Sequence, residues 1–140
     1  RLIPMHYFHI GGDDRVFLNK IALELNMSNI QVQNISLTLK ETMEIFKSSI
    51  FSIGMRFHSV ILQTIISRKN YVLDYTEPNK GKISGFLNDI DENNFFSERY
   101  IALQRDNISL GMIKETEKKI VISNKINDKL DIYISKLIDN

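Results

Sequence analysis

Short apolar runs alternate along this chain with longer stretches of helical periodicity, and this order limits the fold to few possibilities. The runs that predict strands are residues 2–10, 29–36, 50–55, 70–76 and 98–104. Between them, apolar residues recur three and four positions apart, as in an amphipathic helix. Several of the short runs lack a polar face, which is typical of parallel strands buried on both sides. The order predicts an α/β fold in which helices cover both faces of a parallel sheet.

The length and composition suit one folded domain. The chain has 140 residues, of which 43% are hydrophobic and 25% are charged, enough to fill a core. We therefore expect a single domain over residues 1–140, ending in a helical tail at about 108–140. The apolar stripe that predicts this tail consists of Ile126, Leu130, Tyr133 and Leu137.

Several classes of protein are excluded by what the sequence lacks. Without cysteine, it can form no disulfide, thiolate metal site or cysteine nucleophile. The net charge of +1 provides no strong attraction to nucleic acid or to an anionic membrane. No apolar run reaches the ~20 residues of a membrane-spanning helix, and the first ten residues lack the apolar centre of a signal peptide. The chain begins on Arg1 and turns apolar at once, so we expect a piece of a longer protein.

The segment FSIGMRFHSVI, residues 51–61, carries the main candidate site. Ligands of open α/β sheets bind at the carboxyl ends of the strands, where Gly54 would let the backbone approach a ligand. A helix starting near Phe57 would direct its N–H groups and positive dipole end there. Arg56 adds a donor fork suited to carboxylate or phosphate, and His58 adds a group that exchanges a proton near neutral pH. An ordinary structural interpretation also stands, since such an arginine is often a surface residue and such a histidine a cap.

A second cluster lies in LDYTEPNKGK, residues 73–82. Asp74 and Tyr75 end a predicted strand, so their loop would open on the same edge of the sheet. Lys80 and Lys82 follow, and a lysine beside an arginine would strengthen an anion pocket. For Lys80, a solvated loop is the more common situation.

A third cluster, HYFHIGGDDR, spans residues 6–15. His6 and His9 would face opposite sides of a strand, and no third ligand stands at a recognised spacing, so we expect no metal site. His9 is instead assigned to a ligand-facing loop at a strand end. Asp13 or Asp14 is expected to cap the helix that follows, as Thr38 with Glu41 is for the next one.

Two of these segments, taken in order, resemble the C-terminal half of bacterial polysaccharide pyruvyl transferases. In that family a strand ends in Met-Arg-x-His, as at residues 55–58 here, and enters a helix. A later strand ends in a tyrosine-containing loop, as at Asp74-Tyr75, before a Lys-(Ile/Val)-x-Gly-Phe helix start, as at residues 82–86. The opening IPMHYFHIGGDD is also similar, and the likeness covers about residues 3–90. The loop between Tyr75 and Lys82 is longer here than in many members, which leaves open whether Lys80 or Lys82 is the equivalent lysine.

The resemblance implies a three-layer, Rossmann-like domain that forms the C-terminal half of a GT-B-type fold, with the active site between two halves. It also implies transfer of pyruvate from phosphoenolpyruvate to a sugar of a surface polysaccharide, as a ketal. Arg56 would bind the donor's phosphate or carboxylate, and His58 would be the acid/base. Lys82, Tyr75, Gly54 and His9 are the further donor-site candidates.

The implied partners are phosphoenolpyruvate, a glycan or lipid-linked sugar acceptor and a missing N-terminal domain, with no further cofactor. The donor and the lack of an export signal imply a cytoplasmic location, at the inner membrane face for a lipid-linked acceptor. One alternative is the donor half of a sugar-nucleotide-dependent GT-B glycosyltransferase, which also grips a diphosphate. Others are a flavodoxin-like binding module with an incidental arginine, and a receiver domain built on Asp13 and Asp14.

Overall fold

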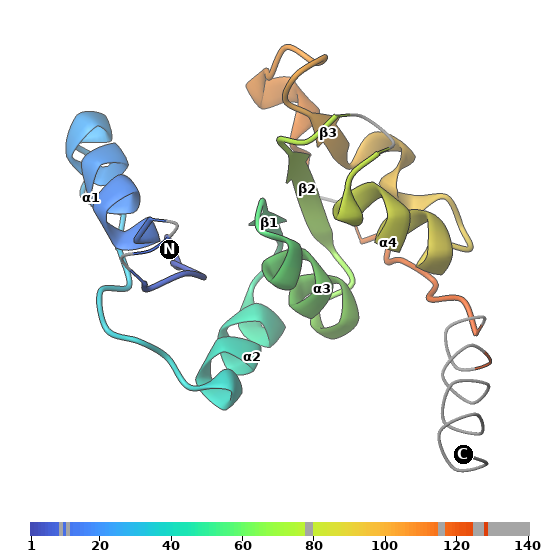
Figure 1. The fold of residues 1–140 in the computed structure, drawn as a ribbon, viewed down its shortest axis with the longest axis horizontal. Coiled ribbons are helices and arrows are strands. Elements are labelled where there is room, and N and C mark those ends of the chain that lie inside the picture. Colours follow the sequence, from blue (N-terminus) through green and yellow to red (C-terminus); the bar gives the residue numbers. More distant parts are fainter. Residues whose placement is uncertain (9, 11, 78–79, 115–116, 125–127, 129–140) are drawn as a thin grey trace. The chain divides into compact units, whose positions relative to one another are not determined.

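The structure is a computed structural model that describes residues 1–8, 10, 12–77, 80–114, 117–124 and 128. The described residues form a mixed α/β fold with four α-helices and a three-stranded parallel sheet (Figure 1). The chain divides into two compact units, Arg1–Glu44 and Ile45–Asn140.

The first unit contains α1 (Asp14–Leu25) and the start of α2 (Leu39–Ser48). Asp13 is the N-cap of α1, and its carboxylate accepts a hydrogen bond from the Arg15 N–H at 2.9 Å. The expected capping box opens α2: the Thr38 N–H donates to Glu41 Oε2 at 2.8 Å, and the Glu41 N–H donates to Thr38 Oγ1 at 3.3 Å. The predicted helix starts at both places are confirmed.

Among the described residues, the two strands predicted in this unit, residues 2–10 and 29–36, are not formed, and a single β-bridge joins the two segments. Leu2 and Val32 form an isolated parallel bridge, and no strand is assigned to the described residues of 2–10 or to 29–36. In residues 2–10 the reason is that backbone groups after Pro4 form hydrogen bonds with Asp14, at the start of α1, and not with a neighbouring strand. The N–H groups of Met5 and His6 both donate to the Asp14 carboxylate at 3.1 Å, and the His6 carbonyl accepts from the Asp14 N–H.

The second unit is built on the sheet. Its strands β1 (Ser52–Gly54), β2 (Asn70–Asp74) and β3 (Tyr100–Ala102) are parallel and lie in the order β1-β2-β3, with Gly54, Val72 and Tyr100 in register. Helix α3 (Phe57–Ile66) connects β1 to β2, and α4 (Lys82–Ile90) with the 3₁₀-helix η1 (Phe95–Glu98) connects β2 to β3 (Figure 1). These elements confirm the predicted parallel sheet.

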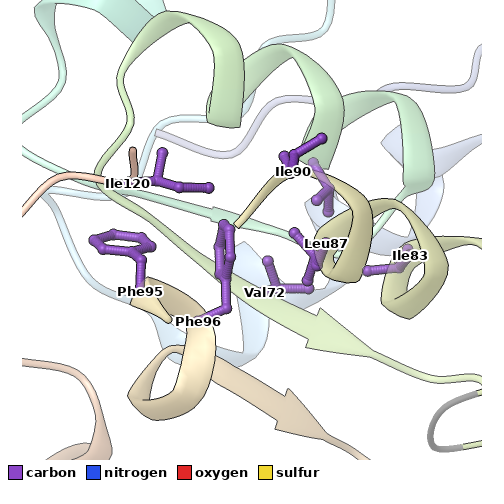
Figure 2. Packing of buried hydrophobic residues seen from close by; sticks show 8 residues of the cluster. Val72, Ile83, Leu87, Ile90, Phe95, Phe96 and Ile120 are labelled. Carbon is purple, nitrogen blue, oxygen red and sulfur yellow. The ribbon is translucent and has the colours of Figure 1, made fainter. Parts of the chain in front are cut away.

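The core of this unit lies on one face of the sheet. Figure 2 shows side chains of α4 and η1 gathered around Val72 of β2. The buried cluster consists of Val60, Val72, Ile83, Leu87, Ile90, Phe95, Phe96 and Ile120. Both α3 and α4 therefore pack on the Val72 face. Two right-handed crossovers between sequentially ordered strands place their helices on the same side, so the expectation that helices cover both faces is wrong for these two.

The opposite face is covered differently around Tyr71. The Arg99 guanidinium lies over the Tyr71 ring, and the Tyr71 hydroxyl donates to the Lys114 carbonyl at 2.6 Å and accepts from the Lys114 N–H at 2.8 Å. Beside Tyr71 in register, Ile53 of β1 is 42% exposed. A loop and one arginine side chain thus take the place of the expected second helical layer here.

In the predicted tail at 108–140, the described residues up to 124 are not α-helical, whereas Asp128 is helical and its N–H donates to the Asn124 carbonyl at 3.3 Å. Apart from the 3₁₀-helix η2 (Leu110–Met112), the described part up to 124 is irregular, with one antiparallel bridge between Ile122 and Asp91. Ile120 is buried in the core, and its N–H donates to the Arg68 carbonyl at 3.1 Å. The contacts of Ile120 and Ile122 with distant parts of the chain have overridden the local helical preference of this segment. The stripe formed by Ile126, Leu130, Tyr133 and Leu137 lies outside the described residues.

Candidate functional site

The carboxyl ends of the three strands lie at one edge of the sheet, because all three are parallel (Figure 1). Gly54 ends β1, and the segment from Arg56 to His58 follows it directly. Asp74 ends β2, and Tyr75 follows. The structure therefore brings the first two predicted clusters to the same edge, where an open α/β sheet binds ligands.

Gly54 owes its place to packing within the unit. A Cβ on residue 54 would lie 2.8 Å from Gln63 Oε1 and 3.0 Å from Val60 Cγ2, both on α3. The sequence suggested that Gly54 lets a ligand approach the backbone. In the structure it is helix α3 that approaches the backbone there. Helix α3 can lie tightly against the end of β1 as a result.

Helix α3 begins without a side-chain cap. Its N-cap is Arg56, which has extended backbone angles, and no acidic residue lies in the first turn. The Ser59 hydroxyl donates to the Arg56 carbonyl at 2.7 Å. The N–H groups of a first turn and the helix dipole favour an anion. The Arg56 side chain is half-buried, and the His58 ring lies edge-on to Phe57 at 5.8 Å.

Helix α4 begins in a similar way. Its N-cap is Gly81, again without a side-chain cap, and Lys82 is its first residue and is exposed. The Ser84 hydroxyl donates to the Gly81 carbonyl at 2.9 Å, as Ser59 does on α3. The Phe57 ring, in the first turn of α3, meets the ring of Phe86, the fifth residue of α4, edge-on at 6.2 Å, so the start of α3 contacts α4.

Asp74 and Thr76 hold the loop between β2 and α4. Asp74 is fully buried, and its Oδ1 accepts hydrogen bonds from the Thr76 N–H at 2.9 Å and the Thr76 hydroxyl at 2.6 Å. Its Oδ2 accepts from the Tyr100 hydroxyl at 2.7 Å. Burial, and then the bond to this carboxylate, raise the pKa of Tyr100 well above its usual range.

The remaining predicted site residues contribute unequally. Tyr75 is 51% exposed, and its carbonyl accepts from Gln104 Nε2 at 3.0 Å. Lys80 pairs with Glu77 at 2.9 Å on the outer surface of the loop, which favours Lys82 as the lysine of the edge. His9, with its neighbour Gly11, lies outside the described residues.

Three residues of this edge, Thr76, Gly81 and Tyr100, are not among the predicted site residues. An aspartate two residues before a threonine, at a strand end, is a signal for the turn that Asp74 makes. From sequence, Gly81 is expected only to interrupt the loop. No local signal marks Tyr100, because its partner Asp74 lies 26 residues earlier in the chain, at the end of the preceding strand.

A hollow of about 230 Å³ lies between α4, η1 and β3, and Ser84 and Tyr100 of its lining are close to the edge. Its lining residues are Ser84, Leu87, Asn88, Asp91, Asn94, Phe96, Ser97 and Tyr100. The hollow contains neither Arg56 nor His58. Both oxygens of Asp91 are already used, because they accept from the Phe95 and Phe96 N–H groups at 2.9 Å. We therefore give the strand-end edge more weight, since it carries the cationic groups.

Within the described residues, no group of three or more histidine or acidic side chains is placed to hold a metal ion. No helix of the described residues is long and apolar enough to cross a membrane. No family model, curated protein or solved structure matches the chain. The geometry of the edge and the local sequence patterns are therefore the basis for any functional conclusion.

Proposed function

We propose that the second unit is the donor-binding part of a polysaccharide pyruvyl transferase, with phosphoenolpyruvate bound at the carboxyl edge of its sheet. The observation that carries this proposal is the pair of helix starts at the carboxyl edge of the sheet, each without a side-chain cap and each with a basic residue, Arg56 or Lys82. Two such starts add positive potential, and the arginine adds a donor fork that matches carboxylate or phosphate.

The family likeness supports the same location. Its two segments, residues 55–58 and 82–86, are the segments that open α3 and α4. On this proposal the domain is a Rossmann-like half of a GT-B-type enzyme. An N-terminal half would close over the edge and complete the pocket.

In the proposed reaction Arg56 holds the anionic groups of the donor, and His58 acts on the proton. One sugar hydroxyl adds to C2 of phosphoenolpyruvate while the methylene carbon takes a proton from His58, which recovers one from that hydroxyl. A second hydroxyl of the sugar then displaces phosphate, and its proton leaves with the phosphate. The products are the cyclic pyruvate ketal and inorganic phosphate. Because phosphoenolpyruvate is a cytoplasmic metabolite, the proposal implies a cytoplasmic enzyme acting on a glycan or lipid-linked sugar.

The test is an amide-resolved NMR titration of the 140-residue chain with phosphoenolpyruvate and, separately, with a nucleotide sugar. Shifts with phosphoenolpyruvate are expected at residues 54–59 and 81–84, and Arg56→Ala should abolish them. The matched control is Arg68→Ala, which removes the same charge just beyond the other end of α3.

The outcomes separate the competing functions. Shifts with the nucleotide sugar alone would assign the unit to a glycosyltransferase, the second candidate, because uncapped helix starts suit a diphosphate equally well. An equal effect of Arg56→Ala and Arg68→Ala would indicate general charge attraction and a non-enzymatic module. No response to either ligand would overturn the anion site on this chain.

A further inference from the structure

Asp74 connects the end of β2 to three hydrogen-bond donors. It is fully buried, and a buried carboxylate is tolerated only when its oxygens are satisfied. Oδ1 takes both donors of Thr76, and Oδ2 takes the Tyr100 hydroxyl from β3. One oxygen therefore holds the loop that leads to α4, and the other holds the neighbouring strand.

Thr76 in turn lies against the N-cap of α4. A Cβ on Gly81 would lie 2.0 Å from Thr76 Oγ1 and 3.0 Å from Thr76 Cβ, so the two residues are in direct contact. The Gly81 carbonyl accepts from the Ser84 hydroxyl and from the Gly85 N–H at 3.1 Å, which begins the helix. A continuous path of contacts thus runs from Asp74 through Thr76 to the first turn of α4.

We propose that Asp74 is a positioning residue of the anion site: through Thr76 it sets where α4 begins, and so places Lys82 and the α4 N–H groups at the carboxyl edge of the sheet. This inference rests on the proposed function. Asp74 does not touch the ligand, because it is buried and both of its oxygens are engaged. Its three donors stabilise the carboxylate in this buried position.

The experiment compares three variants of the 140-residue chain. Thr76→Val keeps the shape of the side chain and removes the hydroxyl that donates to Oδ1. Thr76→Ser keeps that hydroxyl, and Tyr100→Phe removes only the donor to Oδ2. The dissociation constants for phosphoenolpyruvate and inorganic phosphate are measured for each, together with hydrogen exchange of the Gly85 amide without ligand.

Thr76→Val is expected to raise the dissociation constant roughly fivefold to tenfold, the factor for the net contribution of one typical intramolecular hydrogen bond, and to speed exchange of the Gly85 amide. Thr76→Ser should restore both properties. Tyr100→Phe should lower the unfolding midpoint but leave the dissociation constant within about twofold of the parent, since Oδ1 still holds Thr76.

Two results would overturn the inference: normal exchange and affinity in Thr76→Val, or an equal loss of affinity in Tyr100→Phe. Failure of the proposed function gives a different result. The parent chain would then bind neither anion, while exchange of the Gly85 amide would still show whether Thr76 sets the start of α4.

Discussion

The guanidinium carbon of Arg99 lies 4.7 Å from the centre of the Tyr71 ring, over its face. Arg99 is almost completely buried, and it also lies over the Phe95 ring at 4.5 Å. Its Nη1 donates to the Lys69 carbonyl at 3.1 Å, while Nη2 is buried without a hydrogen-bond partner among the described residues. Burial lowers the pKa of this guanidinium. The arginine is therefore a packing element whose charge is poorly compensated.

The packing and the charge of Arg99 can be separated by two substitutions. Arg99→Ala is expected to cost about 2–4 kcal/mol of unfolding free energy, because it empties the space between two rings. Arg99→Met keeps an apolar stem and removes an uncompensated buried charge, so it should cost less than about 1.5 kcal/mol. Urea unfolding measures both. Equal costs would mean that the attraction between cation and ring, and not the stem, stabilises this site.

Two glycines at the start of α4 should respond in opposite directions. Gly81→Ala introduces a Cβ into the space of Thr76, which should lower the unfolding free energy by about 1–3 kcal/mol. Gly85→Ala, inside the same helix, meets no atom within 4 Å and should raise it by about 0.5–1 kcal/mol through helix propensity. Thermal or urea unfolding of the pair checks the prediction. A neutral Gly81→Ala would show that Thr76 does not hold the loop.

Alkaline pH should destabilise the second unit through Tyr100. Its pKa is raised in the folded state, chiefly by burial and then by the bond to Asp74. Its contribution to stability is therefore complete below the unfolded pKa of about 10, and it is lost as pH rises above that value toward the folded pKa. Unfolding midpoints between about pH 9 and pH 11 should fall more steeply in the parent than in Tyr100→Phe. Parallel curves would contradict the raised pKa.

Acidic pH should weaken the start of α2. Hydrogen bonds from the Thr38 hydroxyl and N–H lower the pKa of Glu41. The stabilisation is therefore present above the unfolded pKa of about 4.3 and is lost as pH falls through the lower folded value. Glu41→Gln can still accept the backbone bond and cannot titrate, so its stability should depend less on pH between about pH 5 and pH 2. The pH dependence of unfolding for both proteins measures the difference.

Local signals account for the elements that were predicted correctly. Apolar residues three and four positions apart predicted the helices between the short runs, among them α3 and α4, and the short apolar runs themselves predicted the strands of the sheet. The placing of Arg56 at a strand–helix junction followed from the same local reasoning. These patterns depend on residues within one or two turns of each other, which a sequence displays directly.

The missed features depend on contacts between distant parts of the chain. The Ile120 N–H donates to the Arg68 carbonyl, and its side chain packs in the buried cluster. These distant contacts hold its segment in an irregular conformation where a helix was predicted. The Asp74 network needs Tyr100 from another strand. The face on which α3 and α4 pack follows from strand order, which no single segment encodes.

The sequential strand order has a consequence for synthesis on the ribosome. Each strand of the sheet pairs with the next one along the chain, so β1 and β2 can join through α3 before β3 has been translated. Such neighbour-by-neighbour pairing keeps the loops to be closed short, which favours rapid folding. The exception is Ile120, which completes the cluster around Val72 from the far end of the unit. We therefore expect the nascent chain to hold an open core until the segment containing Ile120 has left the exit tunnel.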